Sequence, residues 1–199
     1  MNGHYYSEKP STSGKTTTIY THQLGSPLIF KSQSGIFSWK QVDTGSEILL
    51  NNLDMPKNGL ILDLGCGYGF LGIALAKAYP DFSLILTDIN ELAVKYSQEN
   101  CIVNKVTKNT IVKQGNLYES IKKRKFDLII TNPPLMAGKA ILKQIISQSV
   151  EYLNENGSLQ LVVPKKKGLI SMQRMLTETY GDFAVLTKKS GFWVLKAYI

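Results

Sequence analysis

From Gly59 to the end of the chain, two patterns of apolar and polar positions alternate. Short apolar runs rich in β-branched residues are typical of buried strands, and the segments between them have the 3.6-residue period of helices. Strands are expected at residues 60–64, 83–87, 110–113, 126–131 and 158–163. Helices are expected at residues 70–78, 91–104, within 137–153 and around 170–180, with a short helical turn after the third strand. This alternation predicts an α/β domain with a parallel sheet and helices on both faces.

The two ends of the chain depart from this alternation. The last two apolar runs, residues 183–187 and 192–197, are separated by Lys188-Lys189-Ser190-Gly191. This connection is too short for a crossover helix and predicts an antiparallel hairpin. Residues 1–55 are rich in Ser, Thr, Gly and Lys, with strand-like segments at 17–22 and 28–31 and a helix start near Thr44. We therefore expect a β-rich extension, residues 1–55, docked on a domain formed by residues 56–199.

The composition is that of one soluble domain, because 43% of the 199 residues are hydrophobic and 19% are charged. No apolar stretch approaches the roughly 20 residues that span a bilayer, and the polar start of the chain lacks the apolar core of a secretory signal. The two cysteines, Cys66 and Cys101, have neither zinc-site spacing nor the density of a disulfide scaffold. We expect a cytoplasmic protein with no membrane segment and no metal.

A net charge of +8 and a pI near 9.3 favour encounter with polyanions. Nucleic acid is the leading class of partner, and simple solubility is the alternative explanation. The positions of the lysines, considered below, bear on this choice.

A glycine-rich turn links the first expected strand to the first expected helix. It reads Asp63-Leu64-Gly65-Cys66-Gly67-Tyr68-Gly69. In this context glycines let the backbone approach a ligand, so a nucleotide-like cofactor is implied; tight packing alone is the alternative. Phe70 stands where the dinucleotide pattern needs its third glycine, which disfavours NAD and a nicotinamide oxidoreductase.

Two later strands also end in candidate cofactor residues. Asp88, with Ile89 beside it, follows the second strand about twenty residues after the glycine turn, where a carboxylate can accept hydrogen bonds from a ribose diol. Asn116 and Leu117 follow the third strand, where an amide and a backbone N–H can bind an adenine edge. Helix capping is the alternative role for Asp88 and Asn116.

The fourth strand ends in Asn132-Pro133-Pro134-Leu135. The two prolines forbid its continuation, so Asn132 lies at the carboxyl end of a parallel strand, the edge at which α/β proteins bind ligands. A simple strand stop is the alternative. The Asn132 side-chain oxygen and the Pro133 carbonyl would offer two fixed acceptors to a substrate amine.

Together these motifs resemble the class I S-adenosylmethionine-dependent methyltransferases. Asp63 to Gly69 correspond to their first motif, Asp88 to the second-strand acid and Asn132 to Leu135 to the catalytic motif. More narrowly, the chain resembles the small-subunit ribosomal RNA guanine-N2 methyltransferases. The stretches that carry this resemblance are residues 4–10, Gly35-Ile36-Phe37-Ser38, Asp43-x-Gly45, and Asn132-Pro133-Pro134-Leu135-Met136-Ala137-Gly138-Lys139.

The resemblance implies a Rossmann-like fold whose seven-stranded sheet has the order 3-2-1-4-5-7-6 with strand 7 antiparallel. It implies S-adenosyl-L-methionine as cofactor, Asp43 and Gly45 in the cofactor pocket, and N-methylation of an exocyclic amine of RNA, guanine N2 of ribosomal RNA above all. Ribosomal RNA or a ribosomal particle is the implied partner.

The chain departs from the family in two ways. Larger members carry a second, degenerate methyltransferase-like domain, for which this sequence has no room, so RNA must be recognised by other surfaces. Relatives often have an aromatic residue at the fourth catalytic position, whereas Leu135 has no π face to stack on a base. Phe37, Trp39, Tyr5 and Tyr6 are the candidate replacements.

Lysines are expected to gather at the carboxyl edge of the sheet, where they would bind phosphates. The set consists of Lys139, Lys165, Lys166, Lys167, Lys188 and Lys189. A second basic cluster, Lys122, Lys123, Arg124 and Lys125, precedes the fourth strand and is expected at the opposite edge as a solvated surface.

Three other functions remain open at this point. They are a methyltransferase for adenine N6 of RNA or DNA, a methyltransferase for a protein glutamine, and a catalytically silent RNA-binding module. The intact Asn132-Pro133-Pro134 argues against the silent module, and Leu135 in place of tyrosine argues against the protein methyltransferase.

Overall fold

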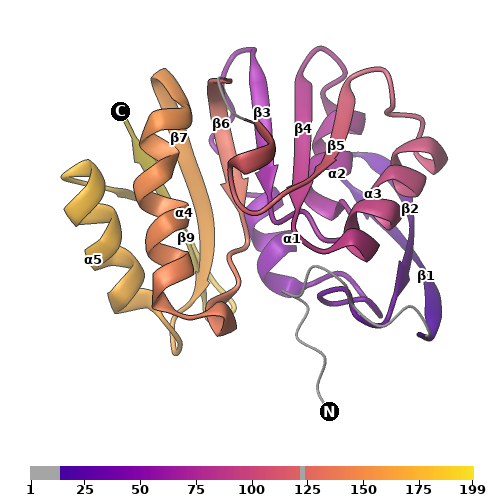
Figure 1. The fold of residues 1–199 in the computed structure, drawn as a ribbon, viewed down its shortest axis with the longest axis horizontal. Coiled ribbons are helices and arrows are strands. Elements are labelled where there is room, and N and C mark those ends of the chain that lie inside the picture. Colours follow the sequence, from indigo (N-terminus) through magenta and orange to yellow (C-terminus); the bar gives the residue numbers. More distant parts are fainter. Residues whose placement is uncertain (1–13, 122–123) are drawn as a thin grey trace.

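A seven-stranded sheet runs through the molecule in a computed structural model that describes residues 14–121 and 124–199 (Figure 1). Its strands are β3 (Leu60–Leu64), β4 (Ser83–Asp88), β5 (Thr110–Gln114), β6 (Phe126–Thr131), β7 (Leu153–Pro164), β8 (Ala184–Lys189) and β9 (Phe192–Tyr198). They lie in the order β5-β4-β3-β6-β7-β9-β8, and only β9 runs antiparallel to its neighbours. Counted from β3, this is the order 3-2-1-4-5-7-6 with the seventh strand antiparallel, so the predicted fold is confirmed.

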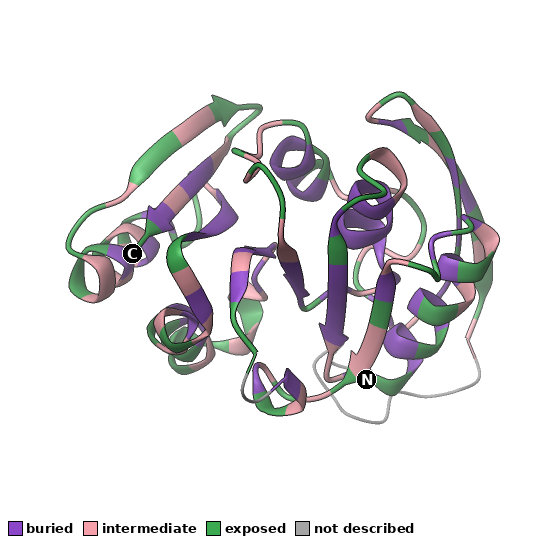
Figure 2. Cartoon of the chain, turned by 90° about the horizontal axis from the view of Figure 1, so that it is seen from above, coloured by how far each residue is buried: buried purple, intermediate pink, exposed green. Residues whose placement is uncertain are grey.

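Helices cover both faces of the sheet. They are α1 (Thr44–Leu50), α2 (Phe70–Ala78), α3 (Glu91–Val103), α4 (Lys139–Tyr152) and α5 (Leu169–Tyr180), with 3₁₀ turns η1 (Glu119–Ile121) and η2 (Leu135–Ala137). Buried residues of α1, α2 and α3 share one hydrophobic core, and those of α4 and α5 share the other. Figure 2 shows the buried residues in the strands and on the helix sides that face them. None of the helices in these described ranges is long and apolar enough to cross a bilayer.

The N-terminal region forms an antiparallel hairpin of β1 (Thr16–Gln23) and β2 (Ser26–Gln33), which packs outside α2 and α3. Two asparagines one helical turn apart, Asn100 on α3 and its C-cap Asn104, bind the edge of β2 that does not pair with β1. Asn100 exchanges two hydrogen bonds of 2.8 and 2.9 Å with the Lys31 backbone. Asn104 does the same with the Ile29 backbone, at 3.0 and 2.8 Å. Residues 14–55 of the extension are therefore β-rich and docked, while a domain boundary at residue 55 stays a prediction.

Two expected element boundaries were wrong. The β8–β9 connection is only Ser190-Gly191, whose φ angles of 48° and 79° suit a two-residue hairpin turn, so Lys188 and Lys189 end β8 instead of forming the turn. Strand β7 starts at Leu153 instead of residue 158, because Leu153 pairs with Phe126 ahead of a register shift.

The order of the strands reverses at β3, since β4 and β5 lie on one side of it and β6 and β7 on the other. Such a switch point leaves a crevice where the strands part at their carboxyl ends. The pairing of β3 with β6 ends at Asp63 and Ile130, and one further hydrogen bond follows, from the Thr131 hydroxyl to the Leu64 carbonyl at 2.8 Å. The fold therefore opens just before Gly65 and Asn132.

Candidate functional site

A cavity of about 380 Å³ occupies this crevice. Its volume is within the range of small-molecule sites. The walls come from the ends of β3, β4, β5 and β6, from the loop before α1, and from the start of β9. The candidate cofactor-binding, catalytic and RNA-binding residues that line it are Asp43, Gly65, Cys66, Gly67, Asp88, Ile89, Asn116, Leu117, Asn132, Pro133, Pro134, Leu135 and Lys167.

The glycine turn exposes its backbone to this cavity. Gly65, Gly67 and Gly69 have φ angles of 77°, 57° and 93°, a region that side chains disfavour. The Gly65 and Cys66 N–H groups donate to the Thr87 carbonyl at 2.8 and 2.9 Å, which ties the turn to β4. A Cβ atom at Gly65 would meet nothing within 4 Å, so the turn leaves open space where a ligand would lie against the main chain.

Asp88 holds the other side of the turn. Its Oδ2 accepts from the Gly67 N–H at 2.8 Å and its Oδ1 from the Asn90 N–H at 2.9 Å. Burial raises the pKa of Asp88, and these backbone hydrogen bonds oppose the rise. A carboxylate oxygen has room for more than one donor, so Asp88 can fix the turn and still accept from a ligand in the cavity.

Asp63 lies behind the turn, outside the cavity wall. The side chain is fully buried, its Oδ2 accepts from the Gly72 N–H in α2 at 2.9 Å, and its Oδ1 has no hydrogen-bond partner among the described residues. Burial raises the pKa of Asp63 from 3.8 to about 7, the Gly72 bond lowers it, and nearby Asp88 raises it further. This position gives Asp63 a part in placing α2 against the glycine turn.

The buried Asp63 makes a pH-dependent contribution to stability. Since its pKa of about 7 in the fold exceeds the unfolded value near 3.8, the folded state holds the proton more tightly. Stability from this group is present below about pH 4 and lost as the pH rises to 7. In urea titrations without ligand, the free energy of unfolding of Asp63→Asn relative to the parent is expected to rise from pH 4 to 7, then level. A constant difference would contradict this expectation.

The predicted catalytic motif, residues 132–135, forms a fixed loop directly after β6. Asn132 follows Thr131 directly, Pro133 is buried, and Leu135 begins η2, which leads into α4. The Asn132 Nδ2 group donates to Asp43 Oδ2 at 2.8 Å and to Ser46 Oγ at 2.9 Å. The motif is therefore joined to α1, whose N-cap is Asp43.

Some of the residues singled out from the sequence do not line the cavity. Gly69 is the N-cap of α2, and Gly45 is buried, where a Cβ atom would lie 3.0 Å from both Asp43 Oδ2 and the Phe192 ring. Among the lysines, only Lys167 is in the wall, and the other five lie outside it: Lys139, Lys165, Lys166, Lys188 and Lys189.

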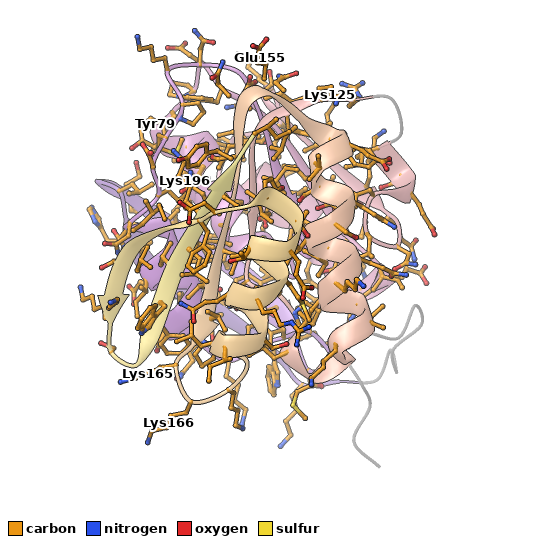
Figure 3. All side chains as sticks on the ribbon, turned by 90° about the vertical axis from the view of Figure 1, so that its left-hand side faces the viewer. Tyr79, Lys125, Glu155, Lys165, Lys166 and Lys196 are labelled. Atoms are coloured by element: carbon orange, nitrogen blue, oxygen red, sulfur yellow. The ribbon has the colours of Figure 1, made fainter. Side chains whose placement is uncertain are left out.

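The lysines nevertheless gather at the predicted edge of the sheet. The Lys165 N–H donates to the Gly191 carbonyl at 2.8 Å, which joins the loop after β7 to the β8–β9 turn. Figure 3 shows Lys165 and Lys166 at the end of the molecule opposite Lys125. Lys188 lies 4.1 Å from the centroid of the Trp193 ring. Of the second basic cluster, Arg124 and Lys125 are exposed, and Lys122 and Lys123 are outside the described residues.

Sequence reasoning missed several cavity residues, notably Ser46, Asn90 and Phe192. Asn90 caps α3 through hydrogen bonds from the Leu92 and Ala93 N–H groups, a role that its position after Asp88 would have signalled. Phe192 carried no local signal, because it reaches the cavity only through the pairing of β9 with Pro164 on β7.

Candidate base-stacking rings fall in three different places. Phe37 lines the cavity and is 43% exposed, and Phe192 lines it from β9. Trp39 is partly buried against the core. Tyr5 and Tyr6 lie outside the described residues. The structure thus adds Phe192 to the candidates, and of the two predicted rings within the described residues, Phe37 and Trp39, it brings Phe37 to the cavity.

Among the described residues, no group of three His, Cys, Asp or Glu side chains is arranged to hold a metal ion. Burial raises the pKa values of both Cys66 and Cys101, which keeps these two thiols protonated. The polar groups among the described residues of the cavity wall are carboxylates, amides, hydroxyls, the main chain and the Lys167 amine.

Residues 27–196 match the family model described as the methyltransferase small domain. The chain belongs to this family. A Bacillus subtilis (strain 168) protein named uncharacterized protein YbxB is 39% identical over 199 residues, which cover 99% of this chain and 98% of that one. A protein named ribosomal RNA small subunit methyltransferase C, from Hamiltonella defensa subsp. Acyrthosiphon pisum (strain 5AT), is 36% identical over 84% of this chain and 49% of its own length.

A solved structure has the same fold as this chain. The structure of T. Thermophilus 16S rRNA N2 G1207 methyltransferase (RsmC) in complex with AdoMet and guanosine matches this chain with a TM-score of 0.82 and 24% sequence identity. The match covers 95% of this chain and 52% of that one. The chain therefore spans about half the length of the ribosomal RNA methyltransferases that it matches. The resemblance found in the sequence is confirmed.

Proposed function

We propose that this protein is an S-adenosylmethionine-dependent N-methyltransferase that acts on an exocyclic amine of RNA, guanine N2 of ribosomal RNA above all. One observation carries the proposal: Asn132 lies in the same cavity as the glycine turn and Asp88, with its amide nitrogen already bound elsewhere. Amine-directed chemistry and nucleotide-type binding groups thus share one site. Relatives named as ribosomal RNA methyltransferases support RNA as the substrate class.

The cavity residues fit S-adenosylmethionine. Asp88 would accept from the ribose hydroxyls, Gly65 and Gly67 would let the main chain lie against the amino acid part, and Asn116 with the Leu117 N–H would bind the adenine edge. Ile89 and Leu117 add apolar surface for a ring. When bound, the cofactor supplies an electrophilic methyl group on a sulfonium sulfur.

The residues of the catalytic loop would act by positioning the amine. The lone pair of an exocyclic guanine amine is delocalised into the ring, so the amine must be oriented before it can attack. The Asn132 Oδ1 atom and the Pro133 carbonyl would accept from its two N–H bonds and direct the lone pair toward the methyl carbon. In this transfer the amine nitrogen would form the new N–C bond as the C–S bond of the donor broke, and one N–H proton would then leave to water.

Guanine-N2 methylation has a direct chemical test. Labelled S-adenosylmethionine is incubated with undermethylated cellular RNA, and the digested nucleosides are identified. We expect N2-methylguanosine. In the matched control, a transcript in which inosine replaces guanosine lacks the N2 amine and should stay unlabelled. N6-methyladenosine, or transfer only to protein, would replace the guanine assignment, and cofactor binding without transfer to RNA, DNA or protein would favour the silent module.

The RNA surface would comprise Lys139, Lys165, Lys166, Lys167, Lys188 and Lys189, all exposed at the cavity end of the sheet. Changing Lys165, Lys166 and Lys167 to glutamine is expected to weaken RNA binding and to lower the slope of log K against log salt by about 2, at roughly 0.7 for each single-strand phosphate contact. Filter binding at several salt concentrations measures both quantities.

The matched control for the lysine variant removes three positive charges at the opposite edge of the sheet. Lys57, Arg124 and Lys125 are exposed residues that precede β3 and β6. Their change to glutamine should lower affinity much less and leave the salt slope close to that of the parent. Equal effects of the two triple variants would show that net charge, and not a local RNA surface, governs binding.

A further inference from the structure

Two acceptors on one side of Asn132 determine which way its amide faces. The Nδ2 group is 2.8 Å from Asp43 Oδ2 and 2.9 Å from Ser46 Oγ. A carboxylate is only an acceptor, so the amide atom that faces Asp43 must be the nitrogen. The Oδ1 atom is then the one that the side chain presents to the cavity.

Asp43 is itself held by the start of α1. The same Oδ2 atom accepts from the Ser46 N–H at 2.8 Å, which makes Asp43 the N-cap of this helix. The helix is anchored by the buried Ile48, Leu49 and Leu50, and Gly45 packs closely against Phe192. The cap of α1 requires a side-chain oxygen at residue 43. The same oxygen, Asp43 Oδ2, is the acceptor for the Asn132 Nδ2 group.

We propose that Asp43 and Ser46 are positioning residues for the transfer reaction, which act through Asn132. They hold the amide with its oxygen toward the substrate amine. The negative charge of Asp43, applied at Nδ2, also polarises the amide and makes Oδ1 a stronger acceptor. This inference rests on the proposed function of Asn132, and it gives Asp43 a role other than the cofactor contact implied by the family resemblance.

A reversed amide would remove the acceptor from the reaction. It would place Oδ1 against the carboxylate of Asp43, where two acceptors repel, and it would turn two N–H donors toward the N–H bonds of the substrate amine. A loss of the Asp43 contact should therefore lower the rate of the chemical step and leave cofactor affinity nearly unchanged.

The first experiment compares Asp43→Ser, which keeps an N-cap residue but shortens the side chain, with Ser46→Ala, which removes the second acceptor. Glu47→Gln is the matched control, because it removes a carboxylate from the exposed side of the same helix. We expect Asp43→Ser to lower the single-turnover rate about 10²-fold at saturating RNA. The dissociation constant of S-adenosylmethionine should change by less than about threefold. Weaker cofactor binding with a normal saturated rate would overturn the proposal.

A double variant separates positioning from a purely structural role. Asn132→Asp places two carboxylates against each other and should be nearly inactive. Adding Asp43→Ser removes this repulsion, so the double variant should be faster than Asn132→Asp alone. A cofactor-binding or structural Asp43 predicts the reverse, since the second change would then only add damage.

Side-chain NMR tests the amide orientation independently of catalysis. The Asn132 amide resonances, assigned by their loss in Asn132→Asp, should be protected from hydrogen exchange in the parent and in Glu47→Gln. They should lose that protection in Asp43→Ser. If the parent did not methylate guanosine, the proposed function would fail while this measurement still decided the orientation; unprotected resonances in the parent would overturn it.

Discussion

Replacement of Asn132 by alanine is expected to lower kcat for methyl transfer by about 10³-fold, at the upper end of the effect of removing one fixed polar group from an active site. The variant loses the side-chain acceptor that we propose orients the amine, while the backbone of the loop stays fixed by Pro133 and Pro134. The affinity for S-adenosylmethionine should be nearly unchanged, because the proposed cofactor-binding groups come from the ends of β3, β4 and β5. Single-turnover transfer and calorimetric titration of the cofactor measure the two effects.

The control for this variant is Asn58→Ala. Asn58 is exposed and precedes β3, at the edge of the sheet opposite the cavity. It should keep parental activity. An active Asn132→Ala protein would remove Asn132 from the mechanism, whereas a loss of both transfer and cofactor binding would indicate that the variant disturbs the whole site.

Replacement of Asp88 by alanine is expected to weaken S-adenosylmethionine binding by about 10²-fold or more, since hydrogen bonds to a charged group contribute roughly 1.5–3 kcal/mol each. The change removes the proposed acceptor for the ribose hydroxyls. It also frees the N–H groups of Gly67 and Asn90, which the two carboxylate oxygens now bind. Both losses act on the glycine turn, so the effect should exceed that of any other single change in the cofactor half of the cavity.

Two further variants separate these contributions in the same titration. Asp88→Asn keeps a carbonyl oxygen for one donor and should bind with intermediate affinity. Asp81→Ala removes an exposed carboxylate before β4, at the opposite edge, and should bind as the parent does. Cofactor affinity in Asp88→Ala equal to that of the parent would exclude Asp88 from the cofactor site.

The local pattern of apolar and polar residues was enough to predict the elements that depend on residues close together in the chain. Apolar period and turn chemistry predicted the five parallel strands and the final hairpin, because strand burial and helix amphipathicity are written at short spacing. The same reasoning placed Asn132 at a strand end, since two prolines stop β6. Strand β7 was predicted to start five residues late because its early pairing with Phe126 depends on a register shift in its neighbour.

The candidate site could be predicted only in part. The glycine turn, Asp88 and Asn132 each follow a recognisable strand, and the carboxyl ends of adjacent parallel strands must meet at one edge. Phe192 was missed because it enters the wall through antiparallel pairing opposite Pro164. Asp63 was assigned to the cofactor by its place in the motif, but its side chain points to the Gly72 N–H behind the turn.

The sequence by itself determined the order of the elements, the class of fold and the loops that carry chemistry, because these follow from short-range periodicity, glycine and proline. Only the tertiary structure decided which side chains meet. Asn132 finds Asp43 across 89 residues of chain, and Asn100 binds Lys31 across 69. Such contacts depend on how α1 and the β1–β2 hairpin dock on the sheet, and docking is set by the combined packing of surfaces from distant segments, which no local pattern records.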